Sequence, residues 1–396
     1  MTPPRIKLPQ GITRNVVVLG VVSLLTDISS EMLYPLIPLF LTSALGASPA
    51  IIGVIEGLAE STASLLKIWS GRWSDQLGAR KPLVFAGYGL SALTRPLLAT
   101  AYSWPTVLLA RLIDRFGKGI RGAPRDALIA DSVEAQYRGR AFGFHRSMDQ
   151  TGAIIGPLLG AGLLHYYGGD FRLVFLTAFL PSLLSTLAIG FAREQPAESL
   201  RPHVALRFQT VSPEFRRFLL LVGLFSLGNS ADAFLILRAR HLGSTTENTL
   251  LLFALFNTVY VLSAYPAGAL SDRFGRVRVF GIGLAAFALV YAGFGLATDA
   301  IALPWLFAVY GLYMGLTDGV SRAVVVDFAP EAQRGTALGL HAAVVGIMAL
   351  PASVFAGWLW TKAGPQWPFL FGAATAASAG TMLLLFGSKT KRASAV

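Results

Sequence analysis

The sequence predicts an all-α membrane protein of twelve transmembrane helices, arranged as two six-helix bundles. Three observations support this fold class: 54% of the residues are apolar and 14% are charged, many apolar stretches are long, and the second half repeats segments of the first. Soluble domains carry roughly one-quarter charged residues, whereas a helix of about 20 apolar residues crosses a hydrocarbon core about 30 Å thick. We therefore expect lipid to surround most of the chain.

The apolar stretches place six helices in each half of the chain. The expected spans are 15–42, 49–72, 81–101, 104–131, 139–168, 170–192, 214–240, 246–270, 278–298, 302–328, 335–362 and 366–388. The 41 glycines fall largely inside these spans. Small residues there allow membrane helices to approach closely, so the glycines need not mark loops.

One long polar segment separates the two sets of helices. Residues 193–213 carry charges and prolines, which neither span lipid nor build a core. We therefore expect an N-terminal six-helix bundle at 1–192, a cytoplasmic linker at 193–213 and a C-terminal six-helix bundle at 214–396.

The basic residues of the loops predict the orientation of the protein. Twenty Lys and Arg residues fall on the side that holds both termini and the linker, and four fall on the other side: Arg172, Arg238, Arg240 and Lys362. The positive-inside rule then places both termini in the cytoplasm, in the inner or plasma membrane of the cell. The formal charge of +12 is thereby accounted for, and we expect no nucleic-acid partner. The basic start of the chain has no cleavage site, so we expect no removable signal peptide.

The composition also argues against several kinds of chemistry. The chain has no cysteine, which excludes disulfides, thiolate metal sites and cysteine nucleophiles. It has no GxxxxGK[ST] loop for nucleotide hydrolysis, and its short loops offer no catalytic constellation. We expect neither an enzyme, nor a cofactor, nor a metal site.

Two segments of the first half recur at a constant spacing in the second. GRWSDQLGARKP from Gly71 matches GALSDRFGRVRV from Gly268, and GAPRDALIADSVEAQYRGRAFGFH from Gly122 matches GVSRAVVVDFAPEAQRGTALGLH from Gly319. Equivalent loops fall on the same side of the membrane, so the halves form a parallel repeat. Transporters built in this way hold their solute between the halves.

The first repeated segment resembles the signature loop of the major facilitator superfamily, G-x-x-x-D-[RK]-x-G-[RK]-[RK]. The two copies retain these residues of the pattern: Gly71, Asp75, Gly78 and Arg80 in the first, and Gly268, Asp272, Arg273, Gly275 and Arg276 in the second. The first copy departs from the pattern at Gln76 and Ala79. The resemblance covers nearly the whole chain and implies a gating latch that stabilises the outward-open state. A tight turn with positive-inside charges is the alternative.

The fifth span carries GAIIGPLLG, with Gly152, Gly156, Pro157 and Gly160. This run resembles the element G-x-x-x-G-P-x-x-G that the same family associates with antiporters and drug efflux, and it therefore implies export. Helix packing with a proline kink is the alternative explanation.

The fourth span has one basic face. Arg111, Arg115, Lys118, Arg121 and Arg125 fall within an arc of about 120° at 100° per residue. Each charge costs roughly 2.5–3.5 kcal/mol near the bilayer centre, so this face must meet water, acids or a solute. The family resemblance places helices 1, 4, 7 and 10 around a central cavity, and so implies an anionic or carboxylate-bearing solute on this face.

The candidate solute-binding residues come from both halves: Arg111, Arg115, Lys118, Arg121, Asp149, Asp318 and Arg322. The alternative for the fourth span is a structural ion-pair network with Asp114, Asp126 and Asp131. Lys118 and Arg121 also replace a glutamine and a glycine of the family's R-x-x-Q-G-x-G-x-A element, which here matches Arg115, Gly119 and Ala123. The acids Glu56 and Glu60 of the second span receive no binding role.

Three acids inside the membrane are candidates for proton coupling. Asp27 and Glu31 lie one turn apart in the first span, and Asp232 occupies roughly the repeat position of Glu31 in the seventh. Paired acids in an apolar setting repel each other, so one of them can take up a proton reversibly. Alternatively, they neutralise the cations of the fourth span and stay ionised.

The leading functional hypothesis is a monomeric secondary active transporter that works by alternating access. It exports a small anionic or zwitterionic organic solute, or a drug, in exchange for protons. Proton-coupled uptake of an organic anion or metal chelate is the second hypothesis, and a membrane sensor that transports nothing is a remote third.

Overall fold

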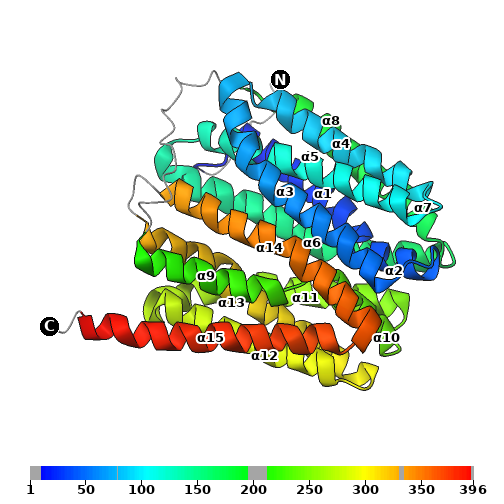
Figure 1. The fold of residues 1–396 in the computed structure, drawn as a ribbon. Coiled ribbons are helices and arrows are strands. Elements are labelled where there is room, and N and C mark those ends of the chain that lie inside the picture. Colours follow the sequence, from blue (N-terminus) through cyan, green and yellow to red (C-terminus); the bar gives the residue numbers. More distant parts are fainter. Residues whose placement is uncertain (1–9, 78, 195–211, 330–333, 394–396) are drawn as a thin grey trace.

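The computed structural model describes residues 10–77, 79–194, 212–329 and 334–393, and the described chain is almost entirely helical (Figure 1). The helices of the first half are α1 (Arg14–Leu33), α2 (Leu36–Ser43), α3 (Pro49–Leu77), α4 (Lys81–Ala99), α5 (Trp104–Asp131), α6 (Arg138–Tyr166), α7 (Phe171–Thr177) and α8 (Phe179–Ala188). Those of the second half are α9 (Pro213–Gly228), α10 (Ala233–His241), α11 (Thr246–Phe274), α12 (Arg276–Leu296), α13 (Leu303–Phe328), α14 (Arg334–Ala363) and α15 (Trp367–Ala393).

These helices make twelve spans, because three spans are built from two helices each: α1 with α2, α7 with α8, and α9 with α10. The predicted all-α membrane fold is thus confirmed. Among the described residues, eight spans are long and apolar enough by composition alone to cross a membrane. The helix α5 does not meet that criterion, since its charged residues interrupt the apolar sequence.

Two of the composite spans break at corresponding places in the two halves. In the first span α1 ends at Leu33 and α2 begins after Pro35, where the proline ring removes a backbone donor. In the seventh span α9 ends at Gly228 and α10 begins at Ala233, which leaves residues 229–232 outside regular helix. Broken membrane helices are tolerated where their free backbone groups line a cavity.

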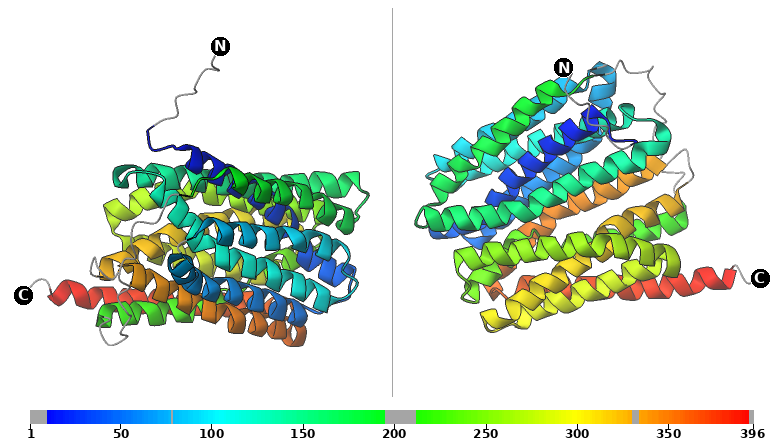
Figure 2. Two further views of the ribbon diagram at one scale, coloured as in Figure 1. Left: turned by 90° about the horizontal axis from the view of Figure 1, so that it is seen from above. Right: turned by 180° about the vertical axis from the view of Figure 1, so that it is seen from behind.

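The two halves meet along two pairs of long helices. The helix α3 packs along α14, and α6 packs along α11; Figures 1 and 2 show the two sets of helices facing each other across this boundary. The α3–α14 contact depends on glycine, because a Cβ atom on Gly357 would lie 2.5 Å from the carbonyl oxygen of Pro49. Across the same boundary, the Ser61 hydroxyl donates a 2.7 Å hydrogen bond to the carbonyl of Gly346.

The expected linker at 193–213 lies largely outside the described residues. The division at 1–192, 193–213 and 214–396 therefore stays a prediction. What the structure does place is the segment just after α8, where the Asn15 side chain donates a 2.7 Å hydrogen bond to the carbonyl of Arg193. The end of the first bundle therefore returns to the start of α1.

Candidate functional site

A cavity of ≈ 460 Å³ lies between the two halves. Its walls come from α1, α3, α5 and α6 on one side, and from α11, α13, α14 and the break between α9 and α10 on the other. Most of the predicted binding and coupling residues line it: Asp27, Glu31, Arg115, Lys118, Asp149, Asp232, Asp318 and Arg322. Residues from five different spans are thereby brought together.

The cavity is accessible from the end of the bundle at which α1 begins. Near that end, the side chains of Arg146 and Arg322 are 52% and 59% exposed. Toward the opposite end the halves are in contact, with the rings of Tyr34 and Phe253 5.6 Å apart. With the termini in the cytoplasm, as the loops predict, this is an inward-facing arrangement.

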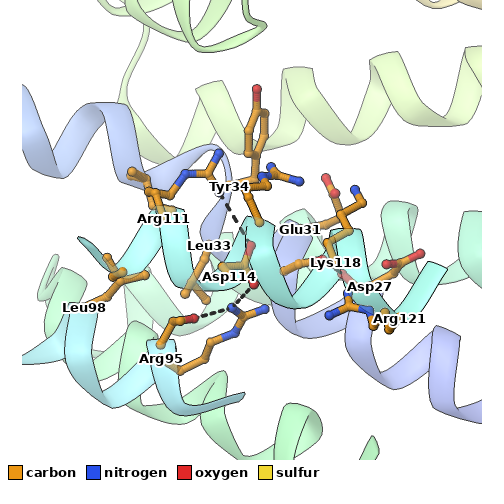
Figure 3. A pocket seen from close by; sticks show the side chains of 15 residues that line it. Asp27, Glu31, Leu33, Tyr34, Arg95, Leu98, Arg111, Asp114, Lys118 and Arg121 are labelled. Carbon is orange, nitrogen blue, oxygen red and sulfur yellow. Dashed lines mark hydrogen bonds and ion pairs between the residues drawn. The ribbon is translucent and has the colours of Figure 1, made fainter. Parts of the chain in front are cut away.

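Lys118 is the basic residue of α5 that is most available to a solute. It is exposed within the bundle, lines the cavity, and has no ion pair within 4.0 Å among the described residues. It interacts electrostatically with Glu60, Asp27 and Glu31. Figure 3 shows that Lys118 and Glu31 also line a second, smaller pocket between α1, α4 and α5.

Two other cations of α5 are paired with α3. The Arg111 guanidinium donates two hydrogen bonds to Glu56, at 3.0 and 2.5 Å, and Arg115 lies 3.1 Å from Glu60. Arg111 does not line the large cavity, whereas Arg115 does. The two acids to which the sequence reasoning gave no binding role are thus the partners of these arginines. Their i,i+4 spacing matches that of Arg111 and Arg115, which is the signal that was available.

Arg121 turns away from the large cavity toward α4. Its guanidinium lies 4.2 Å from the centre of the Tyr88 ring and donates a 2.5 Å hydrogen bond to Ser91. Arg121 instead lines the small pocket between α1, α4 and α5 (Figure 3). In that pocket Arg95, from α4, donates a 2.8 Å hydrogen bond to Asp114. Part of the basic face therefore belongs to a structural ion-pair network.

Asp27 and Glu31 are partly buried and face the cavity. Neither carboxylate forms an ion pair within 4.0 Å in the part of the chain that the structure describes. They therefore differ from Glu56 and Glu60, which are held by arginines. Their proposed role in coupling stays a prediction.

The glycine element of α6 packs directly behind these two acids. A Cβ atom on Gly152 would lie 2.8 Å from the Cβ of Asp27, and one on Gly156 would lie 2.8 Å from the Cβ of Glu31. Gly160 approaches the carbonyl of Met32 in the same way, and Pro157 lies inside the helix. The element therefore brings α6 against the part of α1 that carries the acids.

Asp232 lies in the break between α9 and α10, across the cavity from α1. Its carboxylate accepts a 2.6 Å hydrogen bond from the Tyr310 hydroxyl. Tyr310 in turn packs among aromatic rings, with the Phe256 ring centre 5.1 Å away. The second half thus contributes one acid in an otherwise aromatic setting.

A polar cluster bridges the halves near the mouth of the cavity. Arg146 of α6 donates a 2.9 Å hydrogen bond to Tyr260, and Tyr260 donates one of 2.8 Å to Asp318. Arg322 pairs with Asp318 at 2.6 Å, and Arg146 lies 3.8 Å from Asp149. Neither Arg146 nor Tyr260 was among the predicted binding residues, because no sequence pattern links them.

The signature loops form matching ion pairs within each half. In the second half Arg276 pairs with Asp327 at 2.6 Å and with Asp272 at 3.3 Å, and in the first half Arg80 pairs with Asp131. Each arginine thus ties the start of one α-helix, α4 or α12, to the end of the next, α5 or α13.

Other residues of the predicted latch are placed only in part. Gly275 has φ 97°, which favours glycine, and forms the turn between α11 and α12. The Arg273 guanidinium lies 5.4 Å from the Phe274 ring centre. Gly78, together with the side-chain surroundings of Gly71 and Asp75, lies outside the described residues. A latch between the halves stays a prediction.

Comparison with known proteins identifies the family. The family model described as Major Facilitator Superfamily matches residues 19–238 and 218–395. The chain is 35% identical over 381 residues to an uncharacterized MFS-type transporter of Methanocaldococcus jannaschii, covering 94% of this chain and 95% of that protein. It is 25% identical over 324 residues to multidrug resistance protein MdtH of Aeromonas hydrophila, covering 80% of each.

A solved structure supports the same fold. The crystal structure of a POT family transporter in complex with a thioalcohol-conjugated peptide is similar with a TM-score of 0.80 at 13% identity, covering 96% of this chain and 98% of that one. Together with the repeated halves and the central cavity, these findings confirm the resemblance seen in the signature loops. The chain belongs to the Major Facilitator Superfamily and is a multi-pass membrane transporter of small solutes, not an enzyme.

Proposed function

We propose that the protein is a secondary active exporter that exchanges a small zwitterionic organic solute for protons. The observation that carries this proposal is the arrangement of Lys118, Asp27 and Glu31, one cation and two acids that line the cavity and form no ion pair with any described residue. A zwitterion offers both charges that these groups lack.

The two ends of a zwitterion fit the two signs of charge on this wall. A carboxylate of the solute binds the Lys118 ammonium, and an ammonium of the solute binds Asp27 or Glu31. Such charge-assisted hydrogen bonds are the stronger kind. Protonation of an acid removes its attraction for the solute ammonium, so proton and solute compete for one site. Competition of this kind couples proton entry to solute exit.

Alternating access completes the cycle. In the inward-facing arrangement the solute enters from the end at which Arg146 and Arg322 are exposed. The halves then rock and present the site to the other side, where protons displace the solute. The similarity to a multidrug resistance protein over 80% of the chain supports the outward direction, as does the antiporter-like element of α6.

Uptake of an organic anion together with protons is the second candidate, and the same lysine favours it. A purely anionic solute has no group for Asp27 or Glu31. Protonation of those acids leaves the charge of Lys118 free for the anion, so proton and anion bind together. The sign of the coupling therefore depends on whether the solute carries a cationic group.

Proteoliposomes separate the two candidates. A thermal-shift screen of the purified protein over zwitterionic and anionic metabolites and drugs first supplies a radiolabelled solute. For exchange, an acidic exterior accelerates release of preloaded solute. Accumulation of external solute under that same gradient would contradict export and establish cotransport. Absence of any solute-dependent flux would favour the sensor hypothesis.

A further inference from the structure

The two walls of the cavity differ in chemistry. The wall of the first half carries charged groups at its centre, among them Asp27, Glu31, Arg115 and Lys118. The wall of the second half includes Phe253, Phe256, Tyr310, Met314, Val345 and Ala349, beside the polar residues Asn229, Ser230, Asp232, Asn257 and Ser353. The second-half wall is therefore the more apolar of the two.

The charged groups that the second half contributes to the cavity have polar partners. Asp318 and Arg322 pair with each other at 2.6 Å near the mouth. Asp232 accepts a 2.6 Å hydrogen bond from Tyr310. In contrast to Lys118 and the acids of α1, these groups have partners among the described residues. The second half therefore presents fewer unpartnered charges to the cavity than the first half does.

The apolar wall has a rigid part and an adaptable part. The rings of Phe253 and Phe256 are 5.2 Å apart, and the Tyr310 ring is 5.1 Å from Phe256; such packed aromatic rings hold a fixed surface. Met314 is partly buried and Val345 is 39% exposed. A flexible thioether adapts to differently shaped ligands. A range of apolar groups therefore fits here.

From this asymmetry we propose that the solute is amphipathic. Its charged head lies on the first-half wall at Lys118, and its apolar body, a ring or short hydrocarbon chain, packs on the second-half wall at Phe253, Phe256, Met314 and Val345. The inference rests on the proposed function for the charges of the head only. A wholly hydrophilic solute leaves the apolar wall in contact with water, which forgoes roughly 25 cal/mol per Å² of buried apolar surface. The volume of ≈ 460 Å³ also suits a ligand with both parts.

Equilibrium binding of a ligand series tests the body. Isothermal calorimetry in detergent, without a pH gradient, compares L-alanine, L-norleucine, L-phenylalanine and L-tryptophan, which share one head. The proposal expects affinity to rise along the series, by about tenfold or more from L-alanine to L-phenylalanine, because each buried CH₂ contributes about 0.8 kcal/mol. Affinity that does not rise, or absence of binding by every member, overturns the proposal.

The same assay separates this inference from the proposed function. 3-Phenylpropionate carries the ring and the carboxylate alone, and 2-phenylethylamine carries the ring and the ammonium alone. If either binds as tightly as L-phenylalanine, the proposal that the solute is a zwitterion is refuted, while the proposal that its apolar body binds the second half is kept. If L-alanine binds as tightly as L-phenylalanine and is exchanged for protons, the proposal of an apolar body is refuted, while the proposed function is kept.

A matched pair of variants places the body on the second half. Val345→Ser makes the apolar wall more polar, whereas Ile347→Ser changes a residue of the same helix that is 51% exposed and does not line the cavity. Val345→Ser is expected to weaken L-tryptophan binding by about fivefold and to leave the weaker L-alanine binding unchanged. Ile347→Ser should alter neither. Equal effects of Val345→Ser on both ligands would contradict the placement.

Discussion

Arg146 and Tyr260 join the two halves of the protein through a hydrogen bond of 2.9 Å, in which the arginine donates to the tyrosine hydroxyl. The same hydroxyl donates to Asp318 at 2.8 Å, so that α6, α11 and α13 meet at one point. The bridge lies near the mouth of the cavity. The bridge is formed while the cavity is accessible from this end, and any movement of the halves that widens the mouth further must break it.

Tyr260→Phe removes the shared hydroxyl and keeps the ring. One hydrogen bond contributes about 0.5–1.5 kcal/mol, so access to the cavity should rise by roughly twofold to tenfold. The chain has no cysteine. A single Met314→Cys substitution therefore reports access as the rate of labelling by a membrane-impermeant maleimide. Tyr265→Phe, on the exposed side of the same helix, is the control. An unchanged labelling rate in Tyr260→Phe would mean that the bridge does not restrict the mouth.

The Arg111–Glu56 pair is predicted to serve stability. Both side chains are buried, at 5% and 1% exposure. Removal of one partner leaves an uncompensated buried charge, so Arg111→Leu should lower the free energy of unfolding by about 3–5 kcal/mol. The double variant Arg111→Leu with Glu56→Leu should recover most of that loss. Thermal unfolding in detergent ranks the variants by their stability. A double variant no more stable than Arg111→Leu alone would refute the pairing.

Lys118→Gln should have the opposite profile. Lys118 has no ion pair among the described residues, so its removal breaks no ion pair there. The melting temperature should change little, while solute affinity falls by about tenfold or more, since hydrogen bonds to charged groups contribute about 1.5–3 kcal/mol. Calorimetry and thermal unfolding on one preparation give both values. Unchanged affinity with a large loss of stability would place Lys118 in the structural network instead.

The close packing of α6 on α1 gives a matched pair of glycine variants. A Cβ atom on Gly156 would lie 2.9 Å from the carbonyl of Ile28 and 2.8 Å from the Cβ of Glu31, whereas one on Gly162 would meet nothing within 4 Å. Gly156→Ala should therefore destabilise the protein by about 1–3 kcal/mol through overpacking. Gly162→Ala, in the same helix, should not destabilise it. Similar thermal stability of the two variants would contradict this account of the glycine element.

Most of the spans could be predicted from the sequence because eight of those described are long and apolar enough to cross a bilayer. The basic face of α5 could also be predicted, since helical periodicity sets which side chains share a face. The contact partner of each of those side chains could not be predicted from the sequence. Arg111 turns to α3, Arg121 to α4 and Lys118 to the cavity. An arc of about 120° spans several neighbours of a helix, and only tertiary packing decides which neighbour lies where.

The hydrogen bond between Arg146 and Tyr260 at the mouth also could not be predicted from the sequence. Arg146 and Tyr260 come from different halves and sit in no shared motif, so their contact arises from the docking of α6 on α11. The pairing of Arg111 with Glu56, in contrast, has a signal in the sequence. The i,i+4 spacing of Glu56 and Glu60 repeats that of Arg111 and Arg115, and two such faces can pair along adjacent helices.

Proton coupling is tested by replacing each candidate acid with its amide. Glu31→Gln, Asp27→Asn and Asp232→Asn keep the shape of the side chain but carry no exchangeable charge. If one acid carries the proton, its amide variant should still exchange internal for external labelled solute, because that step needs no proton, and should lose acceleration by a pH gradient. Vesicles containing a pH-sensitive dye measure both on the same sample. Asp232 accepts a hydrogen bond from Tyr310 in the described state, whereas Asp27 and Glu31 have no ion pair there, so we expect the loss in one of the latter two. Gradient-driven transport that persists in all three variants would place the coupling group elsewhere in the cavity, with Asp149 the next acid to examine because it lines the same wall.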